Sequence, residues 1–182
     1  MEIAGEAHRI NTDFRAGIAY SMAAMSGEPI PMEQLLALYF TDGIPADRDA
    51  ALEAVNEFFS GGQTPKKTEG DAPPKPPLYS YAVDAEAIAA AFQHEYQLDL
   101  SAAELHWWRF RALLHGLITH SFPERVRYRA ADPNKIKEKT LRSQYRRLQR
   151  LYTLDAHGRS DRGPQTLEEL NEMLLAQARG ER

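Results

Sequence analysis

Apolar side chains recur at helical spacing along almost the whole chain, and this periodicity limits the fold more than any other feature of the sequence. Phe14, Ile18, Met22 and Met25, for example, are separated by four, four and three residues, which places them on one face of a helix. With 182 residues, 43% of them hydrophobic, the chain is long enough to bury a core. The sequence therefore predicts an all-α protein built as a compact multi-helix domain.

Residues that favour helix ends mark the expected boundaries. Gly61-Gly62 is expected to stop a helix, and the sequence Ser101-Ala-Ala-Glu104 fits a capping box, in which two side chains satisfy two free amides. We expect this box to start a helix that runs from Ala102 to about His120. The other expected starts are Thr12, Pro31, Pro45, Asp84 and, as a second capping box, Thr166-Leu-Glu-Glu169.

The longest interruption of the helical pattern lies between Ser60 and Leu78, where 19 residues include five prolines and three glycines. Connections of this length are functional or disordered in most compact domains. We therefore predict a flexible Pro/Gly loop over 61–78, stiffened by polyproline II near its prolines. The alternative is that this stretch is a ligand for a proline-recognising groove.

The stretch LHWWRFRALLHGL, from Leu105 to Leu117, places two tryptophans beside two arginines. Its apolar residues form two stripes that together cover more than one helix contact needs. We interpret it as the central core helix, with Arg109 and Arg111 at its margin. The alternative is that one tryptophan is exposed to a partner. The stripes are Trp107, Phe110, Leu114 and Leu117, and Leu105, Trp108 and Ala112.

Sequence signals for catalysis are missing. The chain has no cysteine, no phosphate-binding glycine loop, no zinc-binding His-Glu-x-x-His and no Gly-x-Ser-x-Gly, and its six histidines lack metal-ligand spacing. We therefore expect no enzyme activity, cofactor or metal. No apolar run approaches the roughly 20 residues of a membrane span, and the N-terminus does not resemble a signal peptide. A cytoplasmic location and no membrane partner are expected.

Charge is concentrated in one segment. Residues 125–150 contain ten basic and two acidic residues, whereas the whole chain has a net charge of −4. A helix expected near the end of this segment places Leu141, Tyr145, Leu148 and Tyr152 on one face and its basic residues on another. The segment fits a solvated helix face, a surface for an acidic partner or a second copy of the chain, or a phosphate-binding surface with stacking tyrosines.

Three stretches resemble the bacteriophage gene-product-fifteen family of tailed phages and prophages of Gram-positive bacteria. They are INTDFR at 10–15, LHWWRFRALLHGL at 105–117 and RVRYRAADPNKIKEKTLRSQYRRLQRLY at 125–152, within a region of about 8–154. The resemblance implies no enzyme activity. The position of the family's gene in phage genomes implies a tail assembly chaperone. Such a protein binds the tape-measure protein and tail-tube subunits in the host bacterial cytoplasm and is absent from the mature virion.

These expectations divide the chain into a helical domain over 8–154 and a C-terminal extension over 155–182, with an acidic amphipathic helix over 167–179. Self-association is expected where acidic and basic faces of two copies meet. The rival function is a nucleic-acid-binding accessory protein that uses residues 125–150. The predicted partner-binding residues are Trp107, Trp108, Arg111, Lys139, Arg142, Arg146 and Arg150.

Overall fold

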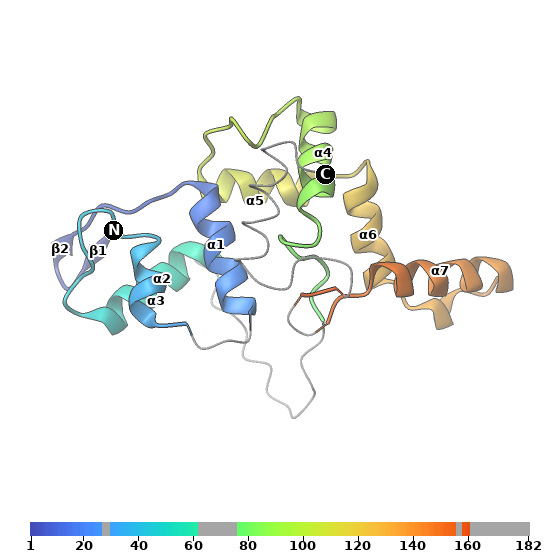
Figure 1. Cartoon of the computed structure of the whole chain (residues 1–182), viewed down its shortest axis with the longest axis horizontal. Helices are drawn as coiled ribbons and strands as arrows, with labels where there is room; N and C mark the ends of the chain where they lie inside the picture. The colour runs from blue at the N-terminus through green and yellow to red at the C-terminus, as the bar shows by residue number, and fades with distance from the viewer. Residues whose placement is uncertain (27–29, 62–75, 156–157, 161–182) are drawn as a thin grey trace, which may run out of the picture. The chain divides into compact units, whose positions relative to one another are not determined.

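A computed structural model describes residues 1–26, 30–61, 76–155 and 158–160 of the chain (Figure 1). These residues contain seven α-helices, one short 3-10 helix and a two-stranded antiparallel hairpin, so the predicted mostly helical class is confirmed. The contacts divide the chain into two compact units. The first unit combines residues 1–73 with 104–115, and the second combines 74–103 with 116–182. The single domain over 8–154 stays a prediction.

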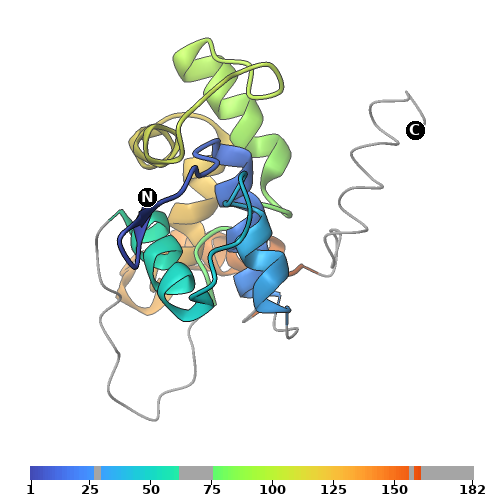
Figure 2. The same ribbon diagram turned by 90° about the vertical axis from the view of Figure 1, so that its left-hand side faces the viewer.

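The first unit is built from the hairpin and four helices. Strands β1 (Glu2–Ile3) and β2 (Glu6–Ala7) pair antiparallel, and the hairpin lies beside α3 (Figure 2). The helices are α1 (Phe14–Met25), α2 (Met32–Ala37), α3 (Arg48–Ser60) and α5 (Trp107–Gly116).

The core of the first unit is rich in aromatic residues. Tyr20 of α1 contacts the rings of Tyr39 and Phe59, and its hydroxyl donates to Asn56 Oδ1 at 2.6 Å. Burial raises the pKa of Tyr20 above its ordinary value. One buried cluster joins the hairpin to α1, α2 and α3, and it comprises Ile3, Tyr20, Leu36, Tyr39, Phe40, Ala51 and Val55.

The observed helix starts differ from two of the expected ones. Asp13, not Thr12, caps α1 and accepts from the N–H of Arg15, and Asp47, not Pro45, caps α3 and accepts from the N–H of Ala50. Asp13 follows Thr12 by one residue, and Asp47 follows Pro45 by two. An aspartate side chain accepts a free amide of the first helical turn, is preferred over threonine as a cap, and has an acceptor that the proline side chain lacks. Gly61 ends α3 with φ of 72°, a left-handed conformation that favours glycine, which confirms the predicted stop.

The predicted capping box at Ser101–Glu104 is wrong. Asp99 accepts from both the N–H and the hydroxyl of Ser101 in a turn, and α5 starts only at Trp107. Tertiary pairing explains the late start. The N–H of Phe14 donates to the Leu105 carbonyl at 3.0 Å, and the N–H of Trp107 donates to the Thr12 carbonyl at 2.8 Å. These bonds hold residues 105 and 106 outside a helix.

The second unit contains α4 (Ala85–Tyr96), α6 (Ser121–Ala130), η1 (Pro133–Lys135) and α7 (Lys139–Tyr152). Helix α7 packs against α6 (Figure 1). The tryptophan helix stops at Gly116 instead of His120, because Glu95 of α4 accepts the amides of Ile118 and Thr119. Most of the predicted 61–78 loop and the predicted helix over 167–179 lie outside the described residues.

Candidate partner-binding surfaces

The two adjacent tryptophans of α5 donate to the last carbonyls of α3. Trp107 Nε1–H donates to the Phe59 carbonyl at 2.9 Å, and Trp108 Nε1–H donates to the Phe58 carbonyl at 2.7 Å. Arg111 Nη1 donates to the Phe59 carbonyl at 2.8 Å, so its positive charge lies at the negative end of the helix. The sequence spacing Trp-Trp-x-x-Arg therefore supplies three donors to two carbonyls of the last turn of α3, of which that of Phe58 also accepts from the N–H of Gly61.

Trp107 lies in the core. Its side chain is 1% exposed and stacks on the ring of Phe59 at a centroid distance of 5.0 Å. The indole also lies directly against the backbone of α1 at Gly17, where a methyl group would come within 2.2 Å of its Cε3 atom. Of the predicted partner-binding residues, Trp107 is thus the one whose side chain presents almost no surface.

Trp108 lies at the surface with its polar atom already bonded. It is 50% exposed, and its ring contacts those of Phe58 and His106 at 5.2 Å. His106 Nδ1 also accepts from the N–H of Trp108 at 3.2 Å, which fixes the start of α5. The sequence left open whether a tryptophan of this helix is exposed, and the structure shows that it is Trp108. We call Phe58, His106 and Trp108 the aromatic surface cluster.

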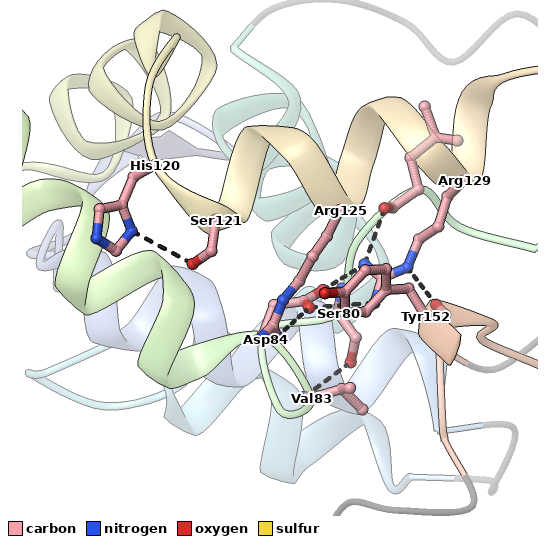
Figure 3. Close-up of polar contacts among 9 residues, drawn as sticks. Ser80, Val83, Asp84, His120, Ser121, Arg125, Arg129 and Tyr152 are labelled. Carbon is pink, nitrogen blue, oxygen red and sulfur yellow. Dashed lines mark hydrogen bonds and ion pairs between the residues drawn. The ribbon is translucent and has the colours of Figure 1, made fainter. Parts of the chain in front are cut away.

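In the second unit, a buried carboxylate organises the polar contacts (Figure 3). Asp84 has no exposed surface and receives Arg129 Nη1 at 2.6 Å, Arg129 Nη2 at 3.1 Å and Arg125 Nη1 at 3.2 Å. It also accepts from the N–H of Ser80 at 3.0 Å. The predicted side-chain cap of α4 is therefore absent, since both oxygens of Asp84 are bonded to residues outside that helix. Such bidentate, charge-assisted bonds are strong and directional.

This ion pair removes two arginines from the proposed phosphate-binding surface. Arg129 is 7% exposed, and it also donates to the carbonyls of Tyr152 and Leu78. Sequence reasoning missed this role because Asp84 is 41 and 45 residues away from its partners. A buried carboxylate in an otherwise helical stretch has no local sequence signal.

The tyrosines of the basic segment pack on one another. The ring of Tyr128 on α6 contacts Tyr145 at 5.3 Å and stacks parallel to Tyr152 at 6.2 Å, and Arg125 lies over Tyr152. These rings join α6 to α7, so they contribute to packing within the unit. Tyr145 and Tyr152 thus lie on one face of α7, as the helical spacing predicted.

Helix α7 has two opposite faces, and none of its side chains is fully buried. Its sequence holds five basic residues and no acidic one. Leu141, opposite the basic face, is 42% exposed, and Leu151, one turn after Arg147 at the edge of that face, is 45% exposed. The exposed basic residues are Lys139, Arg146, Arg147 and Arg150.

Two of the predicted basic residues on α7 have internal partners. Arg142 donates to the carbonyls of Ile136 and Lys137, and Arg146 donates to Asn134 Oδ1 at 3.0 Å. Arg142 thus ties the start of α7 to the preceding loop and is half-buried. Sequence reasoning missed Arg147 and Leu151, which are four residues apart and therefore lie side by side at the edge of the basic face.

Other chemical sites are not supported by the described residues. Over 1–26, 30–61, 76–155 and 158–160 no three metal-ligating side chains come together. A hollow of about 410 Å³ lies between the ends of α6 and α7, but its polar side chains, Arg129, Gln149 and Thr153, already donate to backbone carbonyls. No helix in the described part of the chain is long and apolar enough to cross a membrane.

The described residues thus define a mostly helical protein with one exposed aromatic cluster and one exposed basic helix. Comparison with protein families identifies it: the model described as Bacteriophage Gp15 protein matches residues 1–154, and the chain belongs to that family. The resemblance inferred from the sequence is confirmed over nearly the same residues. No curated protein and no solved structure matches the chain.

Proposed function

We propose that this Gp15-family protein is a non-enzymatic chaperone of phage tail assembly that binds the tape-measure protein and tail-tube subunits. In this proposal it acts in the host cytoplasm, needs no cofactor and is not retained in the virion. Family membership supplies the phage context. The role within tail assembly rests on the associational argument from gene order and on the surfaces of this chain.

One observation supports the proposal most directly: α7 exposes both leucines and basic residues, and exposed Leu151 lies one turn after exposed Arg147. A chaperone of a long helical protein must cover the apolar stripes of that protein and bind its charged surfaces reversibly. An amphipathic helix in a groove is a common recognition mode, and complementary charge adds association rate and selectivity. Leu141 and Leu151 would supply apolar contact, and Arg147 and Arg150 would supply charge.

The aromatic surface cluster offers a second surface of the same kind. Tryptophan is enriched among the residues that dominate binding energy at protein interfaces. Trp108 is held in place by its bond to the Phe58 carbonyl, so little conformational freedom is lost when a partner covers it. A second copy of the chain is also a candidate partner, because chaperones that cover a long rod self-associate when opposite charges meet.

The test is co-expression of the full chain with the tape-measure protein of the same phage, followed by affinity recovery and light scattering. We expect soluble complexes that contain several copies of the chain. Arg147→Glu with Arg150→Glu is expected to reduce recovery at least tenfold. The matched control is Arg9→Glu with Arg48→Glu, which makes the same charge change at two exposed residues of the first unit that belong to neither surface. Equal recovery of both variants would contradict a role for α7.

A nucleic-acid-binding function is the second candidate, because six exposed basic residues cluster in one segment. Within 135–150 they are Lys135, Lys137, Lys139, Arg146, Arg147 and Arg150, and Arg127 of the same basic segment is also exposed. A gel shift whose affinity falls steeply with salt would favour this function. Absence of binding at low salt, together with recovery of the tape-measure protein, would exclude it in favour of the chaperone.

A further inference from the structure

The apolar side of α7 is only partly covered. Helix α6 contacts it through Tyr128, which leaves Leu141 and Leu151 nearly half-exposed near opposite ends of the helix. Basic residues of α7 border this surface, and Glu138 at the start of the helix is engaged as its cap. A segment that covers this surface should therefore be apolar on one side and acidic on another.

The chain carries such a segment downstream. Leu167, Leu170, Leu174 and Ala178 recur at spacings of three and four residues, and the same stretch holds Glu168, Glu169 and Glu172. Residues 167–179 lie outside the described residues, and their sequence predicts an acidic amphipathic helix. Its apolar stripe and its charge both complement α7.

The connection between the two segments is long enough for contact within one chain. Leu154, two residues after the end of α7, is buried, and Asp155 accepts from the backbone N–H and the guanidinium of Arg159, both at less than 3 Å. The seven residues from Ser160 to Leu167 span up to about 24 Å when extended. Helix α7, with 14 residues, is about 21 Å long, so its whole length is within reach. A short tether also gives a high effective concentration, on the order of millimolar.

We propose that residues 167–179 bind along the apolar side of α7 in the same chain, with their leucine stripe against it and their net negative charge attracted to the net positive charge of α7. The C-terminal segment thereby acts as an internal competitor for the surface that we assign to tail proteins. The competition rests on the proposed function, whereas the intramolecular contact does not. A partner helix must displace the segment before it reaches Leu141 and Leu151.

A spin label can test the contact in the full chain, because the chain contains no cysteine and a single one can be introduced. Ala176→Cys places the label on the side of the predicted helix away from the leucine stripe. We expect the amide signals of Leu141, Leu148 and Leu151 to lose most of their intensity when the label is paramagnetic. Leu170→Gln with Leu174→Gln should restore them. Arg179→Gln with Arg182→Gln, two glutamines outside the stripe, should not.

A mixed sample separates contact within one chain from contact between copies. Isotope-labelled chains without a spin label are combined with unlabelled chains that carry it. Loss of signal in the single-chain sample alone supports the proposal. An equal loss of amide signal in the mixed sample overturns the proposal and assigns the surface to a second copy of the chain. No loss of signal in either sample also overturns it.

The competition has its own readout. If the segment covers α7 for about nine-tenths of the time, Leu170→Gln with Leu174→Gln should lower the Kd for the tape-measure protein about tenfold. An unchanged Kd despite a demonstrated contact would place the partner on another surface and overturn the competition. Because the spin-label measurement needs no tail protein, failure of the chaperone function would leave its result intact.

Discussion

Replacing Gly17 with alanine should destabilise the first unit, although alanine is the better helix former. Gly17 lies within α1, where the added Cβ would lie 2.2, 2.4 and 2.7 Å from three atoms of the Trp107 indole. Carbon atoms in contact normally lie about 3.5–4.0 Å apart, so the ring would have to move by more than about 1 Å. It has little freedom to do so, because it is buried, stacked on Phe59 and bonded to the Phe59 carbonyl.

The expected cost follows from three contributions. Overpacking of a core costs about 1–3 kcal/mol, and loss of the buried Trp107 hydrogen bond would cost about 1–3 kcal/mol more. The gain in helix propensity from glycine to alanine offsets about 1 kcal/mol. The net destabilisation of Gly17→Ala should therefore be roughly 1–5 kcal/mol.

Urea unfolding followed by tryptophan fluorescence is the appropriate assay. Both tryptophans of the chain lie on α5, so the signal reports on the first unit. Ala24→Gly, an exposed position on the same helix, is the control and should cost only about 1 kcal/mol. In a Trp107→Leu background the cost of Gly17→Ala should shrink or change sign. Stabilisation by Gly17→Ala in the native background would refute the reasoning.

Three further outcomes are expected. Asp84→Asn leaves the nearly buried Arg129 without its anion and should lower the free energy of unfolding by about 3–5 kcal/mol, measured by urea unfolding with circular dichroism. Glu124→Gln removes a carboxylate from an exposed pair and should cost less than about 1 kcal/mol. Similar costs for the two variants would contradict the argument from the buried pair. Trp107→Ala should cost about 3–5 kcal/mol. Trp108→Ala, at a half-exposed position, should cost much less and reduce tape-measure recovery; an unfolded Trp108→Ala protein would refute that separation. The hydrogen bond from the Thr119 N–H lowers the pKa of Glu95 in the folded state. The Glu95 carboxylate therefore stabilises the fold at pH values above its unfolded-state pKa, and this stabilisation is lost as the pH falls through its folded-state pKa. The difference in stability between the native chain and Glu95→Gln should therefore vanish in acid, and a difference independent of pH would exclude a carboxylate contact.

Sequence periodicity predicted the helical class and most helices because amphipathic spacing is a local property. The boundaries failed where distant residues competed for the backbone. Ser101–Glu104 has the composition of a capping box, but residues 105–107 bond to residues 12–14 instead. Local sequence cannot show a competition with a segment some 90 residues away.

The candidate surfaces were predicted in part for the same reason. The Trp107-Trp108 pair signalled an unusual helix, but its donors meet carbonyls about 50 residues earlier in the chain. Which tryptophan stays exposed depends on that contact and not on the spacing within α5. The two faces of α7 follow directly from helical periodicity, whereas the use of Arg129 inside the fold depends on Asp84.

The composition of the first unit also sets an order for synthesis. Its last helix, α5, is encoded after α4, which belongs to the other unit. Trp107, which donates to the Phe59 carbonyl at the end of α3, is synthesised 48 residues after Phe59. At about 5–20 residues per second this interval is roughly 2–10 s. During that time the nascent chain exposes the apolar surface that α5 later covers, so a protein proposed to shield another chain is itself in need of shielding while it is made.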